Sequence, residues 1–227
     1  MLFPACTTPK QEIFESLASL AQAVGHVNRL ELLEHLAQGP RTVEDLSLRS
    51  GMAFANTSRH LQILRRAGIV RTEREGKFAR YSLNGTAEIV LLIKALGQAA
   101  EKHDAAVDRA LNTHFRNHDA SPPLRREELA ERLRAGGSLV IDVRAEDEFA
   151  VSHIPGASNI PMFDLHNHLE DLPAGREIIV YCRGPYCAQA YEAVGFLRSQ
   201  GRTAIRLEDG FPEWRAFGFP VHIPDVA

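Results

Sequence analysis

Cysteine and tryptophan are scarce in this chain of 227 residues, which contains three cysteines and one tryptophan. Three cysteines cannot form the disulfide framework of a small secreted protein, so we expect a reducing, cytoplasmic environment. The sequence also lacks a run of about eighteen apolar residues, and we expect no contact with a membrane. Residues 1–6 lack the basic flank and apolar core of a secretory signal peptide. These absences favour an intracellular globular protein.

Charge is distributed unevenly along the chain, although the formal net charge is only −3. Residues 41–80 carry nine Lys or Arg against four Asp or Glu, whereas residues 125–227 carry eleven against sixteen. A basic segment followed by an acidic one indicates two partners of different kinds. The length also allows two small domains.

The basic segment has the pattern of a winged helix-turn-helix. Apolar spacing predicts two helices within residues 11–38, a third helix that Thr42 caps and Gly51 ends, and a fourth from Asn56 or Thr57 to Arg66. Alternating runs at 69–74 and 77–83 predict a hairpin. The side chains expected to reach phosphates and base edges of double-stranded DNA are Thr57, Ser58, Arg59, His60 and Gln62 on the helix, with Arg71, Arg74, Lys77 and Arg80 on the hairpin. The alternative is a solvated basic surface.

Residues 25–33, 43–46, 57–70 and 76–83 resemble the ArsR-type family of winged-helix repressors. The resemblance covers roughly residues 10–115. It implies a homodimer that leaves its DNA operator when an inducer binds. Arsenite-sensing members carry a cysteine pair where this chain has Val43, Glu44 and Asp45, so we expect no arsenite site.

Residues 86–118 read as one long helix with an apolar seam for pairing with a second helix. His103 and His114 lie on or beside this seam, in a spacing similar to a metal site of some ArsR-type sensors. The expected last ligand falls at Asn117, which is a poor zinc ligand. A metal site across a dimer and a merely polar seam both fit the pattern; we expect no metal and no cofactor.

Residues 119–124, which include two prolines, are expected to link a first domain at 1–118 to a second at 125–227. In the second domain, predicted strands at 139–144, 177–181 and 203–207 alternate with predicted helices, and Ile160 marks a short edge strand. This alternation is typical of an α/β fold with a parallel sheet. Ligands bind such sheets beyond the carboxyl ends of the strands, where Cys182 lies.

Cys182 stands between a buried strand and a tight loop that leads into a helix. Loop amides and the positive end of a helix favour a thiolate, so the pattern predicts a reactive Cys182 with a depressed pKa. Arg183 adds a neighbouring cation. The alternative is an inert buried cysteine at a strand end.

The second domain resembles the rhodanese family of sulfurtransferases. Three separated stretches carry the resemblance: residues 141–161, the loop from Cys182, and residues 209–214. The family implies that Cys182 takes a sulfane sulfur from thiosulfate, polysulfide or a persulfide and passes it to a nucleophile. The site residues that follow from the resemblance are Cys182, Arg183, Gly184 and Cys187 in the loop, with Asp142 and Arg144 in the first stretch.

The loop departs from the family at its sixth position, where an Arg is common and this chain has Cys187. Related dual-specificity phosphatases close a longer loop with an Arg at the seventh position, where this chain has Ala188. A phosphate would therefore lack its bidentate partner, and sulfur transfer is favoured. Cys187 could attack a Cys182 persulfide, leaving a disulfide or a sulfur bridge. It could equally be a small apolar residue.

Together these patterns predict a dimeric repressor whose rhodanese-like module handles reactive sulfur. One alternative is a metal-responsive repressor with an idle rhodanese fold. Another is a sulfurtransferase that is merely tethered to a DNA-binding dimeriser.

Overall fold

The computed structural model describes residues 8–119, 121–136, 138–173 and 175–224, so the predicted absence of a signal peptide at 1–6 lies outside the described residues. The chain forms two compact units, Met1–Thr86 and Ala87–Ala227. Among the described residues, no helix is long and apolar enough to cross a membrane.

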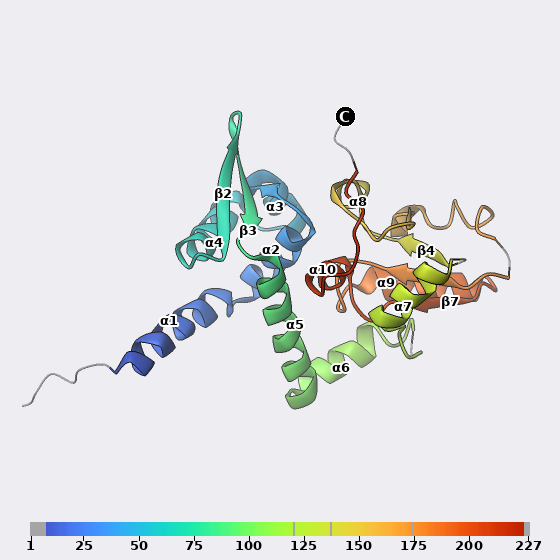
Figure 1. Ribbon diagram of the computed structural model, residues 1–227, viewed down its shortest axis with the longest axis horizontal. Helices are drawn as coiled ribbons and strands as arrows, with labels where there is room; N and C mark the ends of the chain where they lie inside the picture. Colours follow the sequence, from blue (N-terminus) through green and yellow to red (C-terminus); the bar gives the residue numbers. More distant parts are fainter. Residues whose placement is uncertain (1–7, 120, 137, 174, 225–227) are drawn as a thin grey trace, which may run out of the picture. The chain divides into compact units, whose positions relative to one another are not determined.

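The first unit is a winged helix-turn-helix, as predicted (Figure 1). Its helices are α1 (Pro9–Val24), α2 (Val27–Gln38), α3 (Val43–Ser50) and α4 (Phe54–Arg66). Strands β1 (Arg41–Thr42), β2 (Val70–Glu75) and β3 (Phe78–Leu83) form an antiparallel sheet in the order β1-β3-β2. Leucines of α2, α3 and α4 fill the core: Leu32, Leu33, Leu36, Leu46, Leu61 and Leu64 are all buried.

The prediction for the start of α4 was wrong by one turn. The helix begins at Phe54, after Ala53 in an extended conformation, rather than at Asn56 or Thr57. Thr57 does not cap the helix, because its hydroxyl donates a hydrogen bond to the Ala53 carbonyl (3.2 Å) inside the first turn. The Thr42 cap of α3 is confirmed, since its hydroxyl accepts a hydrogen bond from the Asp45 amide (3.2 Å).

The second unit contains the predicted parallel sheet, in the order β5-β4-β6-β7. Its strands are β4 (Leu139–Asp142), β5 (Ser158–Asn159), β6 (Ile178–Tyr181) and β7 (Ala204–Arg206). Three helices precede these strands along the chain: α5 (Thr86–His103), α6 (Ala105–His114) and α7 (Arg126–Ala135). The helices α8 (Glu146–Val151), α9 (Ala188–Ser199) and α10 (Phe211–Ala216), with a 3₁₀ turn η1 (Met162–Asp164), separate or follow them.

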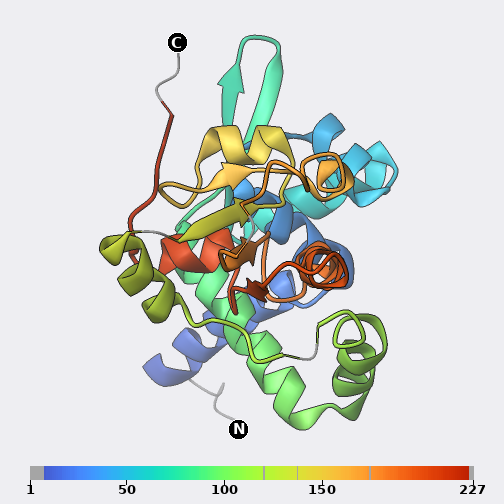
Figure 2. The ribbon, with the colours of Figure 1, turned by 90° about the vertical axis from the view of Figure 1, so that its right-hand side faces the viewer.

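Alternate residues of the central strands face opposite sides of the sheet, so both sides are covered (Figure 2). Ile141 and Val180 pack with α9, which covers one face. Val140 and Ile179 pack with α7 and α10 on the other face. Strands β4 and β6 therefore end side by side, at Asp142 and Tyr181, on the carboxyl edge of the sheet. Cys182 is the next residue after Tyr181.

The single long helix predicted for residues 86–118 is two helices. Asp104 lies in an extended conformation, and its carboxylate accepts a hydrogen bond from the Ala106 amide (2.8 Å), so a new helix starts there. His103 ends α5 and His114 ends α6. The predicted apolar seam required one continuous helix. The shared helix face predicted for His103 and His114 required the same.

The predicted division at 119–124 differs from the boundary of the compact units, which falls after Thr86. Helix α5 beyond its first residue, together with α6, belongs to the second unit. The start of the predicted linker is also anchored, because Arg198 donates hydrogen bonds to the Asp119 carboxylate (2.8 Å) and the Ser121 hydroxyl (2.6 Å). The assignment of functional domains to 1–118 and 125–227 stays a prediction.

Candidate functional site

The six-residue loop from Cys182 to Cys187 brings its two sulfur atoms together. Cys182 directly follows β6, and Cys187 is the residue that precedes α9. Both are free cysteines, and their Sγ atoms lie 2.6 Å apart, which is longer than the roughly 2.05 Å of a disulfide bond. Both cysteines are buried, with exposed fractions of 1% and 8%. The loop therefore closes a cysteine pair at the carboxyl edge of the sheet.

Two further side chains surround this pair. The Gln189 amide oxygen lies 3.6 Å from Cys182 Sγ and accepts a hydrogen bond from Arg183 (3.1 Å). Arg183 also binds the buried Glu148 carboxylate through Nε, at 2.9 Å from each oxygen. Glu148 and Gln189 are not among the residues that the sequence predicts for the site. The sequence does show that Glu148 is a carboxylate in the predicted helix after the strand that ends at Asp142. Only the fold shows that Glu148 lies opposite Arg183.

The predicted depressed pKa of Cys182 is wrong for this structure. Burial raises the pKa of the Cys182 thiol well above its ordinary value, and the hydrogen bond to Cys187 raises it further. The charge and the amide of Arg183 act in the opposite direction but do not outweigh burial. Loop amides and a helix end favour a thiolate, but the burial of Cys182 in this loop has the larger effect on its pKa.

The segment at 209–211 supports the loop from behind. The Phe211 amide donates a hydrogen bond to the Cys182 carbonyl (3.0 Å). Gly210 packs so closely that a side-chain Cβ at this position would lie 2.5 Å from the Gly184 Cα. Glycine is thus required at position 210, because the backbone of Gly184 lies too close for a side chain. Gly184 contributes this backbone surface rather than a reactive group.

Asp142 and Arg144 lie in the interior as an ion pair, and their catalytic role stays a prediction. Both are fully buried, and the Asp142 carboxylate accepts hydrogen bonds from Arg144 Nε (3.0 Å) and Nη2 (2.6 Å). Arg144 Nη2 also donates to the Ser152 carbonyl (2.9 Å), and its guanidinium stacks 4.3 Å from the Phe211 ring. The pair fixes the end of β4 beside β6 and contacts no solvent.

The predicted DNA-binding residues lie on α4 and on the β2–β3 hairpin. Arg59 and Gln62 are exposed on α4, and Ser58 is half-buried. His60 is also half-buried, with Nε2 3.4 Å from Asn28 Nδ2, and burial and then the charge of His26 lower its pKa. Thr57 is fully buried, so it is removed from the predicted DNA contacts.

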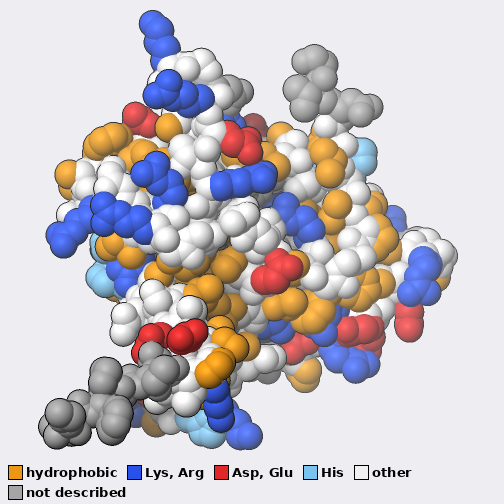
Figure 3. Space-filling model, turned by 60° about the vertical axis from the view of Figure 1, so that its left-hand side comes forward, with side chains coloured by type: hydrophobic (Ala, Val, Ile, Leu, Met, Phe, Trp, Pro, Cys, Tyr) orange, Lys and Arg blue, Asp and Glu red, His pale blue; other side chains and the backbone are white. Residues whose placement is uncertain are grey.

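Arg71, Arg74, Lys77 and Arg80 are all exposed on the hairpin. Figure 3 shows blue Lys and Arg side chains along the hairpin that projects from the first unit. Because phosphates are neutralised by such side chains, the hairpin and the exposed part of α4 form the candidate DNA surface.

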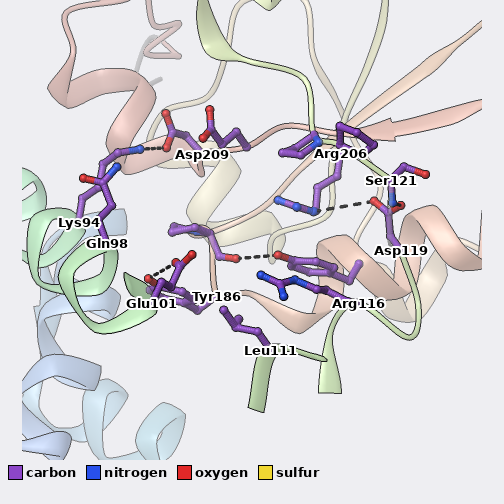
Figure 4. A pocket seen from close by; sticks show the side chains of 15 residues that line it. Lys94, Gln98, Glu101, Leu111, Arg116, Asp119, Ser121, Tyr186, Arg206 and Asp209 are labelled. Carbon is purple, nitrogen blue, oxygen red and sulfur yellow. Dashed lines mark hydrogen bonds and ion pairs between the residues drawn. The ribbon is translucent and has the colours of Figure 1, made fainter. Parts of the chain in front are cut away.

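A cavity of about 400 Å³ lies within the second unit, beside the cysteine loop (Figure 4). Helix α5 contributes Lys94, Gln98 and Glu101 to its lining, and the loop contributes Pro185 and Tyr186. The Tyr186 hydroxyl donates a hydrogen bond to the Glu101 carboxylate (2.6 Å). The cysteine loop therefore contacts α5 directly.

Two family models match separate parts of the chain. "Bacterial regulatory protein, arsR family" matches residues 26–72, and "Rhodanese-like domain" matches residues 125–217. The HTH-type transcriptional regulator Rv0324 of Mycobacterium tuberculosis is 36% identical over 212 residues, which cover 93% of this chain and 92% of that protein. A sulfurtransferase of Allochromatium vinosum is 31% identical over 44% of this chain and 92% of its own length. The regulator NmtR of M. tuberculosis is 36% identical over 41% of this chain and 78% of its own length.

The buried Asp142–Arg144 pair yields a stability prediction. Asp142→Ala should lower the free energy of unfolding of the second unit by about 3–5 kcal/mol, because it leaves a buried guanidinium without its carboxylate. Urea unfolding can be followed by the fluorescence of Trp214, the only tryptophan, which is fully buried in this unit.

Asp108→Ala is the matched control, since it removes an exposed carboxylate that pairs with Arg116 (2.9 Å) and should cost about 0–1 kcal/mol. Equal losses in the two variants would contradict the structural role of the buried pair.

A second prediction concerns the candidate DNA surface. Arg59→Ala should weaken binding to the preferred duplex by about 1–3 kcal/mol, and Lys77→Ala should weaken binding to all duplexes and reduce the salt slope by about one. Fluorescence anisotropy with a duplex selected by the wild-type protein from random sequences measures both effects.

Arg125→Ala, which removes an exposed arginine of the second unit, controls for the change in net charge. Wild-type affinity in Arg59→Ala and Lys77→Ala would show that the DNA surface is elsewhere.

Proposed function

Because this chain belongs to the ArsR family of HTH-type transcriptional regulators and carries a rhodanese-like domain, we propose that it is a repressor that senses sulfane sulfur at Cys182. The observation that supports this proposal most directly is the contact between the Cys182 and Cys187 sulfur atoms, 2.6 Å apart. A sulfurtransferase needs one nucleophilic cysteine, whereas a switch needs a second thiol that can resolve the first. Cys187 supplies that second thiol.

The chemistry begins when the loop opens and Cys182 reaches solvent. Exposure removes the burial that raises the pKa of Cys182, so the thiol can lose its proton to solvent. The thiolate attacks the outer sulfur of thiosulfate, or an inner sulfur of a polysulfide. A new S–S bond forms at Cys182, the S–S bond of the donor breaks, and sulfite or a shorter polysulfide leaves with the electron pair.

Cys187 completes the reaction. Its thiol loses a proton to solvent, and the thiolate attacks Cys182 Sγ, so a Cys182–Cys187 disulfide forms and the persulfide bond breaks. Hydrosulfide leaves with the electron pair. The two thiols are oxidised by two electrons, and the sulfane sulfur is reduced to sulfide. The product is a closed loop without a thiolate, a local change of the kind that switches regulators.

The surroundings of the pair favour sulfur chemistry over phosphate chemistry. The last position of the loop is a thiol, and Arg183 is held by the Glu148 carboxylate and by Gln189. A phosphate dianion at Cys182 would require an arginine whose donors point into the loop.

The proposed regulator acts on double-stranded DNA as a homodimer. Support for a second copy of the chain comes from α1, where Ile13, Phe14 and Leu17 present one apolar face with exposed fractions of 60%, 57% and 57%. Apolar side chains gathered on one helix face indicate a protein partner. A dimer also presents two α4 helices to the two halves of a palindromic operator.

Peptide mapping after polysulfide treatment tests the cysteine pair. Trypsin cleaves after Arg176, Arg183 and Arg198, so Cys182 and Cys187 fall in different peptides and a disulfide joins them. Wild type should yield the joined peptides and should release its operator. Cys187→Ser should accumulate a Cys182 persulfide without the joined product, and Cys182→Ser should lose transfer of sulfur from thiosulfate to cyanide completely.

Cys6→Ser is the control for thiol loss at an unrelated position. If the wild-type protein forms a stable Cys182 persulfide but keeps its operator affinity, the switch is contradicted. The rhodanese-like domain is then a sulfurtransferase that is merely tethered to the DNA-binding domain. Operator release by a divalent metal ion, with no response to polysulfide, would instead support the metal-responsive alternative.

A further inference from the structure

Tyr186 connects the cysteine loop to helix α5. It lies next to Cys187 in the loop, and its side chain reaches Glu101 of α5 (Figure 4). Its hydroxyl donates a hydrogen bond to Glu101 Oε1 (2.6 Å), and a side-chain Cβ at Gly97 would lie 2.9 Å from the Tyr186 Cε2 and overlap its hydroxyl. Gly97 and Glu101 are one turn apart on the same face of α5. We call these three residues the Tyr186 anchor.

The packing of the anchor is close. Although Tyr186 is 37% exposed, partial burial followed by the hydrogen bond to Glu101 raises the pKa of its phenol, so the hydroxyl stays protonated and donates. Glycine at position 97 is therefore explained by contact with the ring, because α5 is otherwise a regular helix in which alanine would be the better residue.

A second connection joins α5 to the segment behind the loop. Lys94, one turn before Gln98 on α5, forms an ion pair with the buried Asp209 carboxylate, which Arg126 also binds (2.6 Å). Asp209 precedes Gly210, which packs against Gly184 in the loop. The tip of the loop thus contacts α5 through Tyr186. The segment behind the loop contacts α5 through Asp209.

We propose that Tyr186 is a positioning residue that couples the state of the cysteine loop to α5, a proposal that rests on sulfur chemistry at Cys182 for its biological meaning. A persulfide places a third sulfur about 2.05 Å from Cys182 Sγ. Cys182 is 1% exposed and already touches Cys187, and close-packed interiors have no room for an extra atom. The loop must move to admit it.

The movement falls mainly on residues 183–186. Cys182 is held by the end of β6 and by the Phe211 amide, and Cys187 is held by the start of α9. Tyr186 is the loop residue that contacts α5, so opening the loop strains or breaks the Tyr186 anchor. Coupling is reciprocal: whatever loosens the anchor favours the open loop, and whatever opens the loop weakens the contact of Tyr186 with α5. Helix α5 begins at Thr86, soon after β3 ends at Leu83, so it carries this change toward the hairpin along the chain.

Alkylation of Cys182 by iodoacetamide tests the coupling without any sulfur donor. In the full chain, Gly97→Ala should raise the alkylation rate by about fivefold or more, the lower end of ordinary coupling between sites, because the new methyl group displaces Tyr186. Tyr186→Phe and Glu101→Ala should both raise the rate, since each removes the hydrogen bond. Glu101→Gln keeps an acceptor for the Tyr186 hydroxyl and should restore the wild-type rate.

A double-mutant cycle separates the contact from a general effect on the helix. In the Tyr186→Ala background, Gly97→Ala should have no further effect on alkylation, because the group with which the methyl clashes is gone. An equal effect of Gly97→Ala with and without Tyr186 would overturn the proposal and assign the change to helix propensity. Wild-type alkylation rates in Tyr186→Phe and Glu101→Ala would overturn it as well.

Operator binding provides the second readout. With sodium tetrasulfide as donor, Cys182 of Tyr186→Ala should still gain sulfur, but the operator affinity of this variant should no longer change. An unchanged polysulfide response of Tyr186→Ala overturns the coupling, even if its alkylation is faster. If wild type itself gains no sulfur, the proposed function fails, while the alkylation cycle still decides whether Tyr186 positions the loop.

Discussion

The contact between two buried sulfur atoms is the constraint on which the second unit depends. Cys182 ends a central strand and Cys187 precedes the helix that covers the sheet, so their contact fixes the path of the four residues between them. A loop this short cannot change its path without moving its backbone. In the proposed function, an atom added at Cys182 therefore requires the loop backbone to move. Burial also raises the pKa of Cys182, which favours its protonated form. Reactivity is therefore tied to opening.

Charged groups around the loop are buried and paired, and their function is to hold backbone in place. The Asp142–Arg144 pair fixes the neighbouring strand end, and Asp209 joins Lys94 and Arg126 behind the loop. Glu148 holds Arg183 beside Cys182. Buried charges that have such partners are costly to disturb one at a time, which makes the frame rigid. Against a rigid frame, the loop is the part that can respond to a modification at Cys182.

Helix α5 has contacts of two kinds. Its first residue follows the hairpin of the winged unit, and its later turns bear Gly97 and Glu101, which receive Tyr186. The proposed coupling therefore concerns the part of α5 that belongs to the second unit. The start of the predicted linker is anchored in the same unit, where Arg198 binds Asp119.

The sequence by itself determined the order of elements, both folds and the identity of the two loop cysteines. Hydrophobic periodicity, the Thr42 cap and the two alternating runs of the hairpin are local signals, and local signals can be recognised in a single sequence. The early start of α4 and the helix break at Asp104 are local features that hydrophobic periodicity does not reveal. The burial of Thr57 and the structural role of Asp142 and Arg144 depend on the packing of the whole unit. The tertiary structure alone decided the pKa direction of Cys182, the partner of Arg183 and the contact of Tyr186 with α5. Burial and pairing are properties of the surroundings, and no residue type encodes its surroundings.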